Sequence, residues 1–447
     1  MKKVCVLGLG YIGLPTSIIM AEHGIEVVGF DVNAQRVERI NHCDPVIQEP
    51  EIFERLQAVV QKKLFRATVT IERADYFIIA VPTPFTDNKK ADLTFVFQAA
   101  KTIAQVLRPG NVVILESTVP VGATKQLTEM LEKETGLKVE KDFFVAHCPE
   151  RVLPGKIFKE LVFNARIIGG MTPTCVEHTK SLYKQFVKGP LYLTDATTAE
   201  MVKLVENSSR DVAIAFANQV ASMAHEVGLD PYEVIELANK HPRVNILRPG
   251  CGVGGHCIAV DPWFLVEGFP QQTALLKTAR EVNDDKPLEV IARVQHHVTL
   301  WQKNNAGKIP KILVLGLTYK PDVDDLRESP ALFIAQQLAK LPNYQIMVSE
   351  PMVSSDLVAQ KVSAEIVGCK EGIAHADIIV CLVGHTLFKQ ELANVAAHKI
   401  IIDCCGLLYQ ARQDSQEQEK LFWPASSDYT WPEYSKVLHD SEQEKLI

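Results

Sequence analysis

Several absences narrow the range of functions open to this sequence. No apolar run reaches the length of a membrane span, and no excess of cations marks a nucleic-acid surface, since the net charge is −7. The N-terminal start does not match a signal peptide, because Gly8, Gly10 and Gly13 interrupt its apolar run. The ten cysteines include no CxxC pair, and we interpret them as reduced thiols. We therefore expect a cytoplasmic protein with neither nucleic-acid nor membrane partners.

What is present is an ordinary globular composition in which strand and helix patterns alternate. Hydrophobic residues make up 47% and charged residues 23% of the 447 residues, which suits two or three domains with a sizeable core. Apolar strands are predicted at residues 3–7, 27–30, 76–81, 112–116 and 143–147, with helical stretches such as 14–24 between them. This alternation predicts an α/β fold with a parallel, doubly wound sheet.

The middle of the chain changes to helices. Residues 197–227 contain neither Gly nor Pro, which predicts one long helix that ends at Gly228. Further helices are predicted at residues 231–240 and 273–295. A glycine-rich loop, PGCGVGGHC, lies between them.

The third segment repeats the pattern of the first. KILVLGLTY at residues 311–319 matches KVCVLGLGY at residues 3–11 in six of nine positions, and ADIIVCLV at 376–383 resembles ADYFIIAV at 74–81. We predict two Rossmann-like doubly wound parallel-sheet domains, at residues 1–193 and 304–447. A central helical domain with a long helix, at residues 194–303, joins them.

The motif GLGYIG at residues 8–13 indicates a dinucleotide site. Gly8 permits a tight turn, Gly10 lets the backbone approach a pyrophosphate, and Gly13 lets helix and strand pack closely, with Tyr11 and Ile12 completing the motif. The alternative is a purely structural glycine turn.

An acid at the end of the next predicted strand supports the dinucleotide site. Asp31 follows Gly13 by 18 residues, where a carboxylate binds ribose hydroxyls and repels a 2′-phosphate, so we predict NAD rather than NADP. Arg36 is the one residue that favours NADP, because a cation can bind a 2′-phosphate, although it could instead lie against the adenine.

Later strand ends offer further ligand contacts. Thr83 in VPTP and Thr118 in ESTVPVG follow apolar strands and are predicted beside the cofactor, unless they only form turns. The repeated turn has Thr318 where the first has Gly10, so we expect a different phosphate ligand there. Lys320 and Arg327 are its candidate cations, unless the charged segment is merely solvated.

Cys257 is the candidate nucleophile. Glycines precede it in GVGGHCIAVDP, which is unlike the apolar runs that hold core cysteines, and a lowered pKa would give the reactive thiolate. The alternatives are core packing and a zinc site of His256, Cys257 and Asp261. We disfavour zinc because adjacent residues chelate poorly, and we predict no metal.

The long helix carries three polar residues on one face. Lys203, Asn207 and Arg210 have the spacing i, i+4 and i+7. Such a stripe on an apolar helix indicates either a functional site or a solvated face.

Together these motifs resemble the UDP-glucose/GDP-mannose dehydrogenase family along nearly the whole chain. GLGYIGLP, VPTP, EST, CPERVLPG, TAEMVKLVENSSRDV, HPRVN, GVGGHCIAVDP and GLTYKPDVDDLRESP stand in the family's order. CPERVLPGK, NKHPRVN and GGHCIAVDPWF look like its bacterial UDP-N-acetyl-D-mannosamine branch. UDP-glucose enzymes of the family typically have lysine where this chain has Val260.

The resemblance implies a four-electron oxidation of a sugar C6 hydroxymethyl with two NAD. An aldehyde forms first, Cys257 adds to it, and a thioester forms and is hydrolysed. Lys203 would exchange protons and stabilise oxyanions, Asn207 and Asp261 would hold a water, and Glu150 would assist hydrolysis. Thr118 counts among both the catalytic and the cofactor residues, and Arg327 would contact the cofactor.

The resemblance also implies the substrate contacts and a partner. The expected contacts to the UDP-N-acetylhexosamine are Arg151, Val152, Lys203, Asn207, Arg210, His241, Arg243, Gly254, Tyr319 and Lys320. A homodimer through the central helix is expected, with higher oligomers left open, and Arg243 can reach the neighbouring subunit's site. Cys251, where the branch often has proline, could form a regulatory disulfide with Cys257.

Three other functions remain open. A sister enzyme would act on UDP-N-acetylglucosamine, UDP-glucose or GDP-mannose. A regulator would bind nucleotides without catalysis, and an ordinary dehydrogenase of a small hydroxy acid would remove only two electrons.

Overall fold

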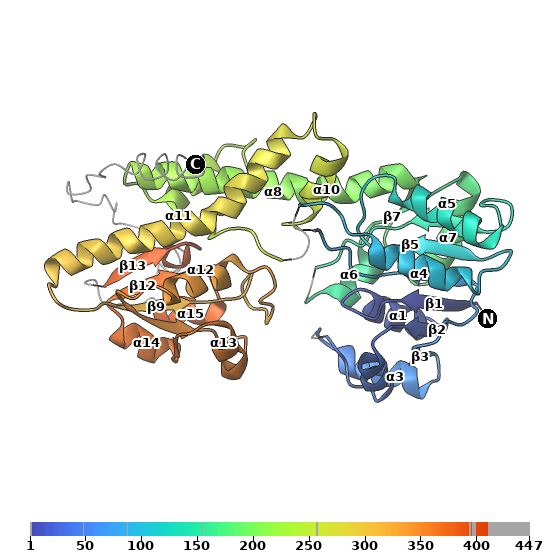
Figure 1. Ribbon diagram of the computed structural model, residues 1–447, viewed down its shortest axis with the longest axis horizontal. Coiled ribbons are helices and arrows are strands. Elements are labelled where there is room, and N and C mark those ends of the chain that lie inside the picture. Colours follow the sequence, from blue (N-terminus) through green and yellow to red (C-terminus); the bar gives the residue numbers. More distant parts are fainter. Residues whose placement is uncertain are drawn as a thin grey trace. The chain divides into compact units, whose positions relative to one another are not determined.

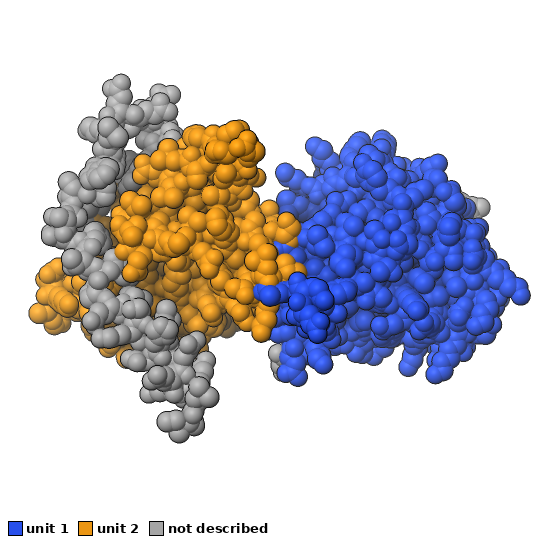
Figure 2. Space-filling view, turned by 90° about the horizontal axis from the view of Figure 1, so that it is seen from above, with its two compact units in different colours: residues 1–208, 260–274 blue, residues 209–259, 275–447 orange. Residues whose placement is uncertain are grey.

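The computed structural model describes residues 2–47, 49–86, 88–153, 155–255, 258–392, 395 and 399–409. The chain divides into two compact units, which Figure 2 colours separately. The first contains residues 1–208 and 260–274, and the second contains residues 209–259 and 275–447. Each unit is described by itself.

An eight-stranded sheet forms the centre of the first unit. Its strands are β1 (Lys3–Leu7), β2 (Glu26–Phe30), β3 (Phe65–Thr68), β4 (Tyr76–Ile79), β5 (Val112–Leu115), β6 (Phe144–His147), β7 (Arg166–Gly170) and β8 (Leu191–Asp195). The strand order is β3-β2-β1-β4-β5-β6-β7-β8. Because the order reverses between β1 and β4, the crevice at the carboxyl ends of these strands is where such sheets bind ligands.

Helices cover both faces of this sheet (Figure 1). They are α1 (Gly13–Glu22), α2 (Ala34–Asn41), α3 (Ile52–Gln61), α4 (Thr94–Ala104), α5 (Ala123–Thr135), α6 (Ile157–Phe163) and α7 (Pro173–Tyr183), and the first unit also contains α10 (Asp261–Gly268). The alternation of side chains along β1 explains the two layers. Val4 and Val6 pack with α1, α3, α6 and α7, whereas Cys5 and Leu7 pack with α4 and α5.

One strand pair in this sheet departs from the parallel pattern. β7 runs antiparallel to β6, with Ala146 opposite Gly170 and His147 opposite Gly169. The short α6 does not carry the chain back across the sheet, so β7 starts at the carboxyl edge where β6 ends. Arg166, the first residue of β7, is thereby placed at the ligand-binding edge.

The second unit contains a smaller sheet of the same topology. Its strands are β9 (Lys311–Leu315), β10 (Gln345–Ser349), β11 (Glu365–Ile366), β12 (Ile378–Cys381) and β13 (Ile400–Asp403), in the order β11-β10-β9-β12-β13 and all parallel. The helices α12 (Pro330–Ala339), α13 (Ser355–Lys361), α14 (Cys369–His375) and α15 (Thr386–Leu392) belong to it. Side chains of α12 and α13 pack on one face of the sheet, and those of α14 and α15 on the other.

The part of the chain that lies between the two sheet-forming segments in sequence is helical. It contains α8 (Ala196–Glu226), α9 (Pro231–Ala238) and α11 (Ala274–Asn304). The predicted long helix is confirmed within one residue at each end, and Gly228 follows it with a left-handed φ of 74°. α11 is longer than expected and includes Pro287 in its interior.

The predicted fold class is therefore confirmed. Both parallel-sheet regions and the long helix between them are present. Among the described helices, none is both long enough and apolar enough to cross a membrane.

A buried ion pair joins α8 and α11 within the second unit. The Arg280 guanidinium donates to Asp211 Oδ1 over 2.6 Å, and Asn283 Nδ2 donates to the same oxygen over 2.8 Å. Arg280 and Asp211 are fully buried. Burial raises the pKa of Asp211, and the charge of Arg280 opposes that shift.

We predict that Arg280→Leu lowers the free energy of unfolding by about 3–5 kcal/mol, because it leaves the Asp211 carboxylate buried without its cation. Urea unfolding measures the loss. Lys277→Ala is the control on the same helix, since exposed Lys277 makes only a surface pair with Glu281, and it should change stability by less than about 0.5 kcal/mol. Equal effects of the two variants would contradict the importance assigned to the buried pair.

Candidate active site

The glycine turn between β1 and α1 has the geometry of a phosphate-binding loop. Gly8 has φ 94°, and a Cβ there would lie 2.6 Å from the Ala80 carbonyl oxygen. A Cβ at Gly13 would lie 1.8 Å from the Gly8 carbonyl oxygen, so helix and turn pack as closely as glycine allows. A Cβ at Gly10 would meet nothing within 4 Å. The open space therefore lies where a pyrophosphate would approach the backbone.

The N-terminus of α1 is available to an anion. Its N-cap residue, Ile12, makes no side-chain cap, and the first turn contains no acid. The positive end of the helix dipole therefore favours a phosphate there. Tyr11 and Ile12 are half-buried in the turn.

Asp31 lies beside this turn and is nearly buried, with 4% of its surface exposed. Its carboxylate accepts hydrogen bonds from the backbone N–H groups of Leu9 and Asn33, each over 2.9 Å. The Arg36 guanidinium also donates to it, over 3.0 Å. The structure thus brings Asp31 and Arg36 together and holds the carboxylate in the position that binds ribose.

Two threonine-containing loops complete this edge. Ser117 joins them, because its hydroxyl accepts from the Val81 N–H over 2.9 Å and donates to the Val81 carbonyl over 2.7 Å. Thr83 and Thr118, which flank this link, are both half-buried. Thr83 therefore follows the carboxyl end of β4, and Thr118 follows that of β5. This is the edge of the sheet at which such folds bind ligands.

A site of this kind places the chain in the class of dinucleotide-dependent dehydrogenases. The open space at Gly10, the uncapped helix and the strand-end carboxylate fit the phosphates and ribose of a dinucleotide.

The second glycine turn, in the other unit, has the same hydrogen bond between a carboxylate and a backbone N–H group. Side chains fill the space that is open beside Gly10 in the first turn. Leu317 N–H donates to Glu350 Oε2 over 2.7 Å, as Leu9 does to Asp31. However, Thr318 stands at the Gly10 position, and its hydroxyl donates to the Lys320 carbonyl over 2.9 Å and lies 3.2 Å from Nε2 of buried His385. These contacts support the prediction that this turn is a poor dinucleotide site.

Three of the predicted substrate residues of this unit, Gly254, Tyr319 and Lys320, lie close together. A Cβ at Gly254 would lie 3.0 Å from Tyr319 Cβ, and the Lys320 amine lies 5.6 Å from the Tyr319 ring centre. Arg327 forms an ion pair with Asp325 at 2.6 Å and remains about half exposed. His241 and Arg243 are exposed in the turn after α9.

The polar face of α8 meets the first turn of α10. Asn207 Nδ2 donates to Asp261 Oδ2 over 2.5 Å, and only 3% of Asp261 is exposed. Burial raises the pKa of Asp261 to about 6, and Lys203 and the Asn207 hydrogen bond oppose this shift. Lys203 is itself half-buried. The structure therefore brings Lys203, Asn207 and Asp261 together, whereas Arg210 of the same helix is exposed in the second unit.

The segment after β6 is held by charges that the sequence motifs did not reveal. Glu150 accepts from Arg166 over 2.8 Å, and Arg151 forms a bidentate pair with Glu206 of α8 at 2.9 and 2.5 Å. Val152 beside them is half-buried. Arg151, predicted as a substrate contact, thus has an intramolecular partner. The i, i+3 spacing of Lys203 and Glu206 was the available signal for including Glu206 in this face.

The candidate nucleophile lies outside the described residues. Cys257 and His256 both belong to the segment that the structure leaves undescribed, so the covalent role and the zinc alternative stay predictions. Cys251 is described, as a free thiol in the core of the second unit with its Sγ 3.6 Å from the Leu382 carbonyl. Burial raises the pKa of Cys251, which disfavours the thiolate that a regulatory disulfide exchange requires.

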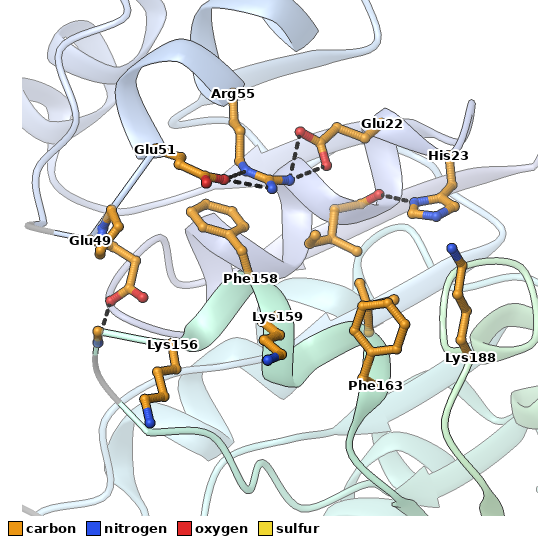
Figure 3. Close-up of a pocket in the computed structure, with 14 residues that line it drawn as sticks. Glu22, His23, Glu49, Glu51, Arg55, Lys156, Phe158, Lys159, Phe163 and Lys188 are labelled. Atoms are coloured by element: carbon orange, nitrogen blue, oxygen red, sulfur yellow. Dashed lines mark hydrogen bonds and ion pairs between the residues drawn. The ribbon is translucent and has the colours of Figure 1, made fainter.

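A cavity of about 360 Å³ lies elsewhere on the first unit, beside the C-terminal turn of α1 (Figure 3). Arg55 is neutralised there by Glu22 and Glu51, each within 3 Å. Glu49 accepts from the N–H groups that begin α6. None of the predicted site residues lines this cavity.

The chain belongs to the UDP-glucose/GDP-mannose dehydrogenase family. Its NAD binding domain matches residues 2–187, its central domain residues 197–285, and its UDP binding domain residues 313–410. The predicted family and the predicted cofactor, NAD, are thereby confirmed.

Named relatives cover almost the whole chain. The NDP-N-acetyl-D-galactosaminuronic acid dehydrogenase of Ralstonia nicotianae is 46% identical, over 91% of this chain and 96% of its own. The UDP-N-acetyl-D-mannosamine dehydrogenase of Campylobacter jejuni is 48% identical, over 90% and 99%. The solved UDP-D-ManNAc dehydrogenase of Pyrococcus horikoshii is 41% identical with a TM-score of 0.82, over 91% and 96%.

We predict that Gly10→Ala and Gly13→Ala fail in different ways. The Gly10 methyl group enters open space, so stability should change by less than about 1 kcal/mol while NAD affinity falls at least about tenfold, because the methyl group occupies the pyrophosphate approach. The Gly13 methyl group meets the Gly8 carbonyl, so that variant should lose stability. Calorimetric NAD titration and urea unfolding separate the effects. Normal NAD binding by Gly10→Ala would contradict the assignment.

Proposed function

We propose that this enzyme oxidises the C6 hydroxymethyl of UDP-N-acetyl-D-mannosamine to the carboxylate, giving UDP-N-acetyl-D-mannosaminuronate. Two relatives whose names specify N-acetylhexosamine derivatives support the sugar class, and the 48% identical one is named for the manno epimer. Val260, in place of the lysine typical of UDP-glucose enzymes, supports the same choice. UDP-N-acetylglucosamine and UDP-glucose are the alternative substrates, and a non-catalytic nucleotide-binding regulator is the alternative of another class.

The Asn207–Asp261 pair carries the catalytic part of this proposal. It is a buried carboxylate that accepts from a half-buried amide next to a lysine, in a chain with an NAD domain, and a regulator without catalysis would gain nothing from burying the carboxylate. Cys257 precedes Asp261 by only four residues, which supports a shared site.

The proposed chemistry gives each of these groups a role. NAD, when bound, accepts a hydride in each of two oxidations. Lys203 takes the C6 hydroxyl proton and then stabilises oxyanions by its charge. The Cys257 thiolate adds to the aldehyde carbon to give a thiohemiacetal, whose oxidation gives a thioester. Asn207 and Asp261 orient the water that attacks the thioester carbon, Glu150 takes its proton, and the thiolate leaves.

The remaining proposed contacts follow from the same assignment. The residues that would hold NAD are Gly8, Gly10, Tyr11, Ile12, Gly13, Asp31, Arg36, Thr83, Thr118 and Arg327. The residues that would contact the nucleotide sugar are Arg151, Val152, Arg210, His241, Arg243, Gly254, Tyr319 and Lys320. The three-domain division at residues 193/194 and 303/304, a cytoplasmic location and a role in bacterial surface polysaccharide synthesis belong to the proposal as well.

We also propose a homodimer through the central helix. Phe216, Met223 and Val227 of α8 and its C-terminal end have 52%, 61% and 68% of their surfaces exposed, at the spacing i, i+7 and i+11 of one helix face. An exposed apolar stripe of this kind on a long helix is typical of a protein–protein interface. Exposed Arg243 would then reach the partner's site.

The oxidation is tested by counting NADH per sugar across UDP- and GDP-sugars. We expect two NADH per sugar, with UDP-N-acetyl-D-mannosamine giving the highest kcat/KM. Cys257→Ser should bind NAD normally but form less than about 1% of the acid, because an alkoxide or hydroxyl cannot replace the thiolate in this step. One NADH per sugar, or wild-type acid yield from Cys257→Ser, would contradict the covalent route.

The dimer is tested by sedimentation and by subunit mixing. Met223→Asp should give monomers, whereas Leu357→Asp, at an exposed leucine of α13, should not. Arg243→Ala and Cys257→Ser are each expected to be inactive, and a 1:1 mixture should recover about a quarter of wild-type activity, since half of the dimers are mixed and each has one complete site. Absence of recovery in verified mixed dimers would show that Arg243 serves its own subunit.

A further inference from the structure

A buried network of charges surrounds Arg166 in the first unit. Because β7 is antiparallel to β6, its first residue stands at the carboxyl edge of the sheet, next to the segment that carries Glu150. Only 5% of Arg166 is exposed, and its guanidinium lies 4.8 Å from the Tyr183 ring centre. Two carboxylates share this one guanidinium, Glu150 and Glu116.

Arg166 and the backbone hold the two oxygens of Glu150. Arg166 Nη2 donates to Glu150 Oε2 over 2.8 Å, and the Arg151 N–H donates to Oε1 over 2.5 Å. Donors on both oxygens fix the plane of the carboxyl group and suit its ionised, acceptor-only form. Arg166 and the Arg151 N–H therefore fix the rotamer of Glu150 together.

Glu116, the residue that follows β5, contacts the other nitrogen of the Arg166 guanidinium. Its Oε1 accepts from Arg166 Nη1 over 3.1 Å and from the Tyr183 hydroxyl over 2.6 Å. Its Oε2 is buried and has no hydrogen-bond partner among the described residues. That oxygen is the place in the network where a proton can reside without breaking a bond.

The charges do not balance if both acids are ionised. Arg166 is the cation that faces Glu116, while Glu150, Tyr183 and Cys148 are the other titratable groups around it. Burial raises the pKa of Glu116 to about 7, Arg166 opposes the shift and Glu150 adds to it. When Glu116 is protonated, its neutral carboxyl group no longer competes with Glu150 for the positive charge of Arg166.

We propose that Arg166 and Glu116 are positioning residues for Glu150. Arg166 fixes the direction of the Glu150 carboxylate, and Glu116 carries the network's surplus proton so that it does not compete with Glu150 for Arg166. This inference rests on the proposed role of Glu150 in thioester hydrolysis. In that step water adds to the thioester carbon, the C–S bond breaks, and the water proton passes to Glu150; the proton on Glu116 does not move.

The first test separates thioester formation from hydrolysis in single turnovers. With Arg166→Lys we expect the NADH burst to keep its rate while acyl-enzyme decay slows about 10- to 100-fold, because a lysine cannot bridge both carboxylates and Glu150 loses its orientation. Acid-quenched intact-mass measurements should then detect the accumulated acyl adduct. Lys180→Ala, at a half-buried residue of α7 that pairs with the exposed Glu177, is the control and should leave both rates unchanged.

The second test uses Glu116→Gln, which keeps the size and the Arg166 contact and removes the ionisation. In the wild type the decay rate should fall as pH rises through about 7, since ionised Glu116 then competes for Arg166. In Glu116→Gln this inflection should disappear. The isosteric variant keeps the inference testable if Arg166→Lys does not fold.

The outcomes distinguish this inference from a purely structural ion pair. Equal losses in burst and decay for Arg166→Lys, or an unchanged inflection in Glu116→Gln, would overturn it. A wild-type enzyme that never forms an acyl adduct, together with acid formation by Cys257→Ser, would instead overturn the proposed function itself.

Discussion

A single hydrogen bond recurs in both units and determines the shape of their ligand-binding turns. In each, a carboxylate at the end of the second strand accepts from the amide that follows the first glycine of the turn: Asp31 from Leu9 over 2.9 Å, and Glu350 from Leu317 over 2.7 Å. The bond satisfies a buried N–H group. The residue that follows this amide, Gly10 or Thr318, then determines how much space the turn offers a ligand. Gly10 leaves that corner open, whereas Thr318 and His385 fill its counterpart. Two similar folds thereby present different turns to their ligands.

Much of this architecture could be predicted from the sequence because its signals are local. Apolar runs between glycine turns indicated the strands, and a stretch of 31 residues without Gly or Pro indicated α8. The glycine motif followed by Asp31 indicated the cofactor, because each residue has a separate steric or charge role. The polar stripe of α8 was visible as a spacing, and Asn207 proved to contact Asp261.

The rest depended on tertiary contacts that local patterns do not contain. The antiparallel direction of β7 follows from where the chain leaves α6, and no periodicity in residues 166–170 reveals it. The extension of α11 to Asn304, beyond the predicted end at residue 295, accompanies the burial of Val298 in the core of the second unit. No strand was predicted at residues 166–170, and only the fold shows that Arg166 contacts Glu116 and Glu150 together. Partners of buried charges were thus the least predictable part of the site.

The burial of thiols has a practical consequence for chemistry on this protein. Seven of the described cysteines are buried: Cys5, Cys148, Cys175, Cys251, Cys369, Cys381 and Cys404. Burial also raises the pKa of the half-exposed Cys405, and thiols of this kind react slowly with electrophiles. A mild alkylating probe applied to the folded enzyme would therefore meet little background labelling from them. Among the described cysteines, labelling of the folded enzyme should therefore concentrate on the half-exposed Cys43.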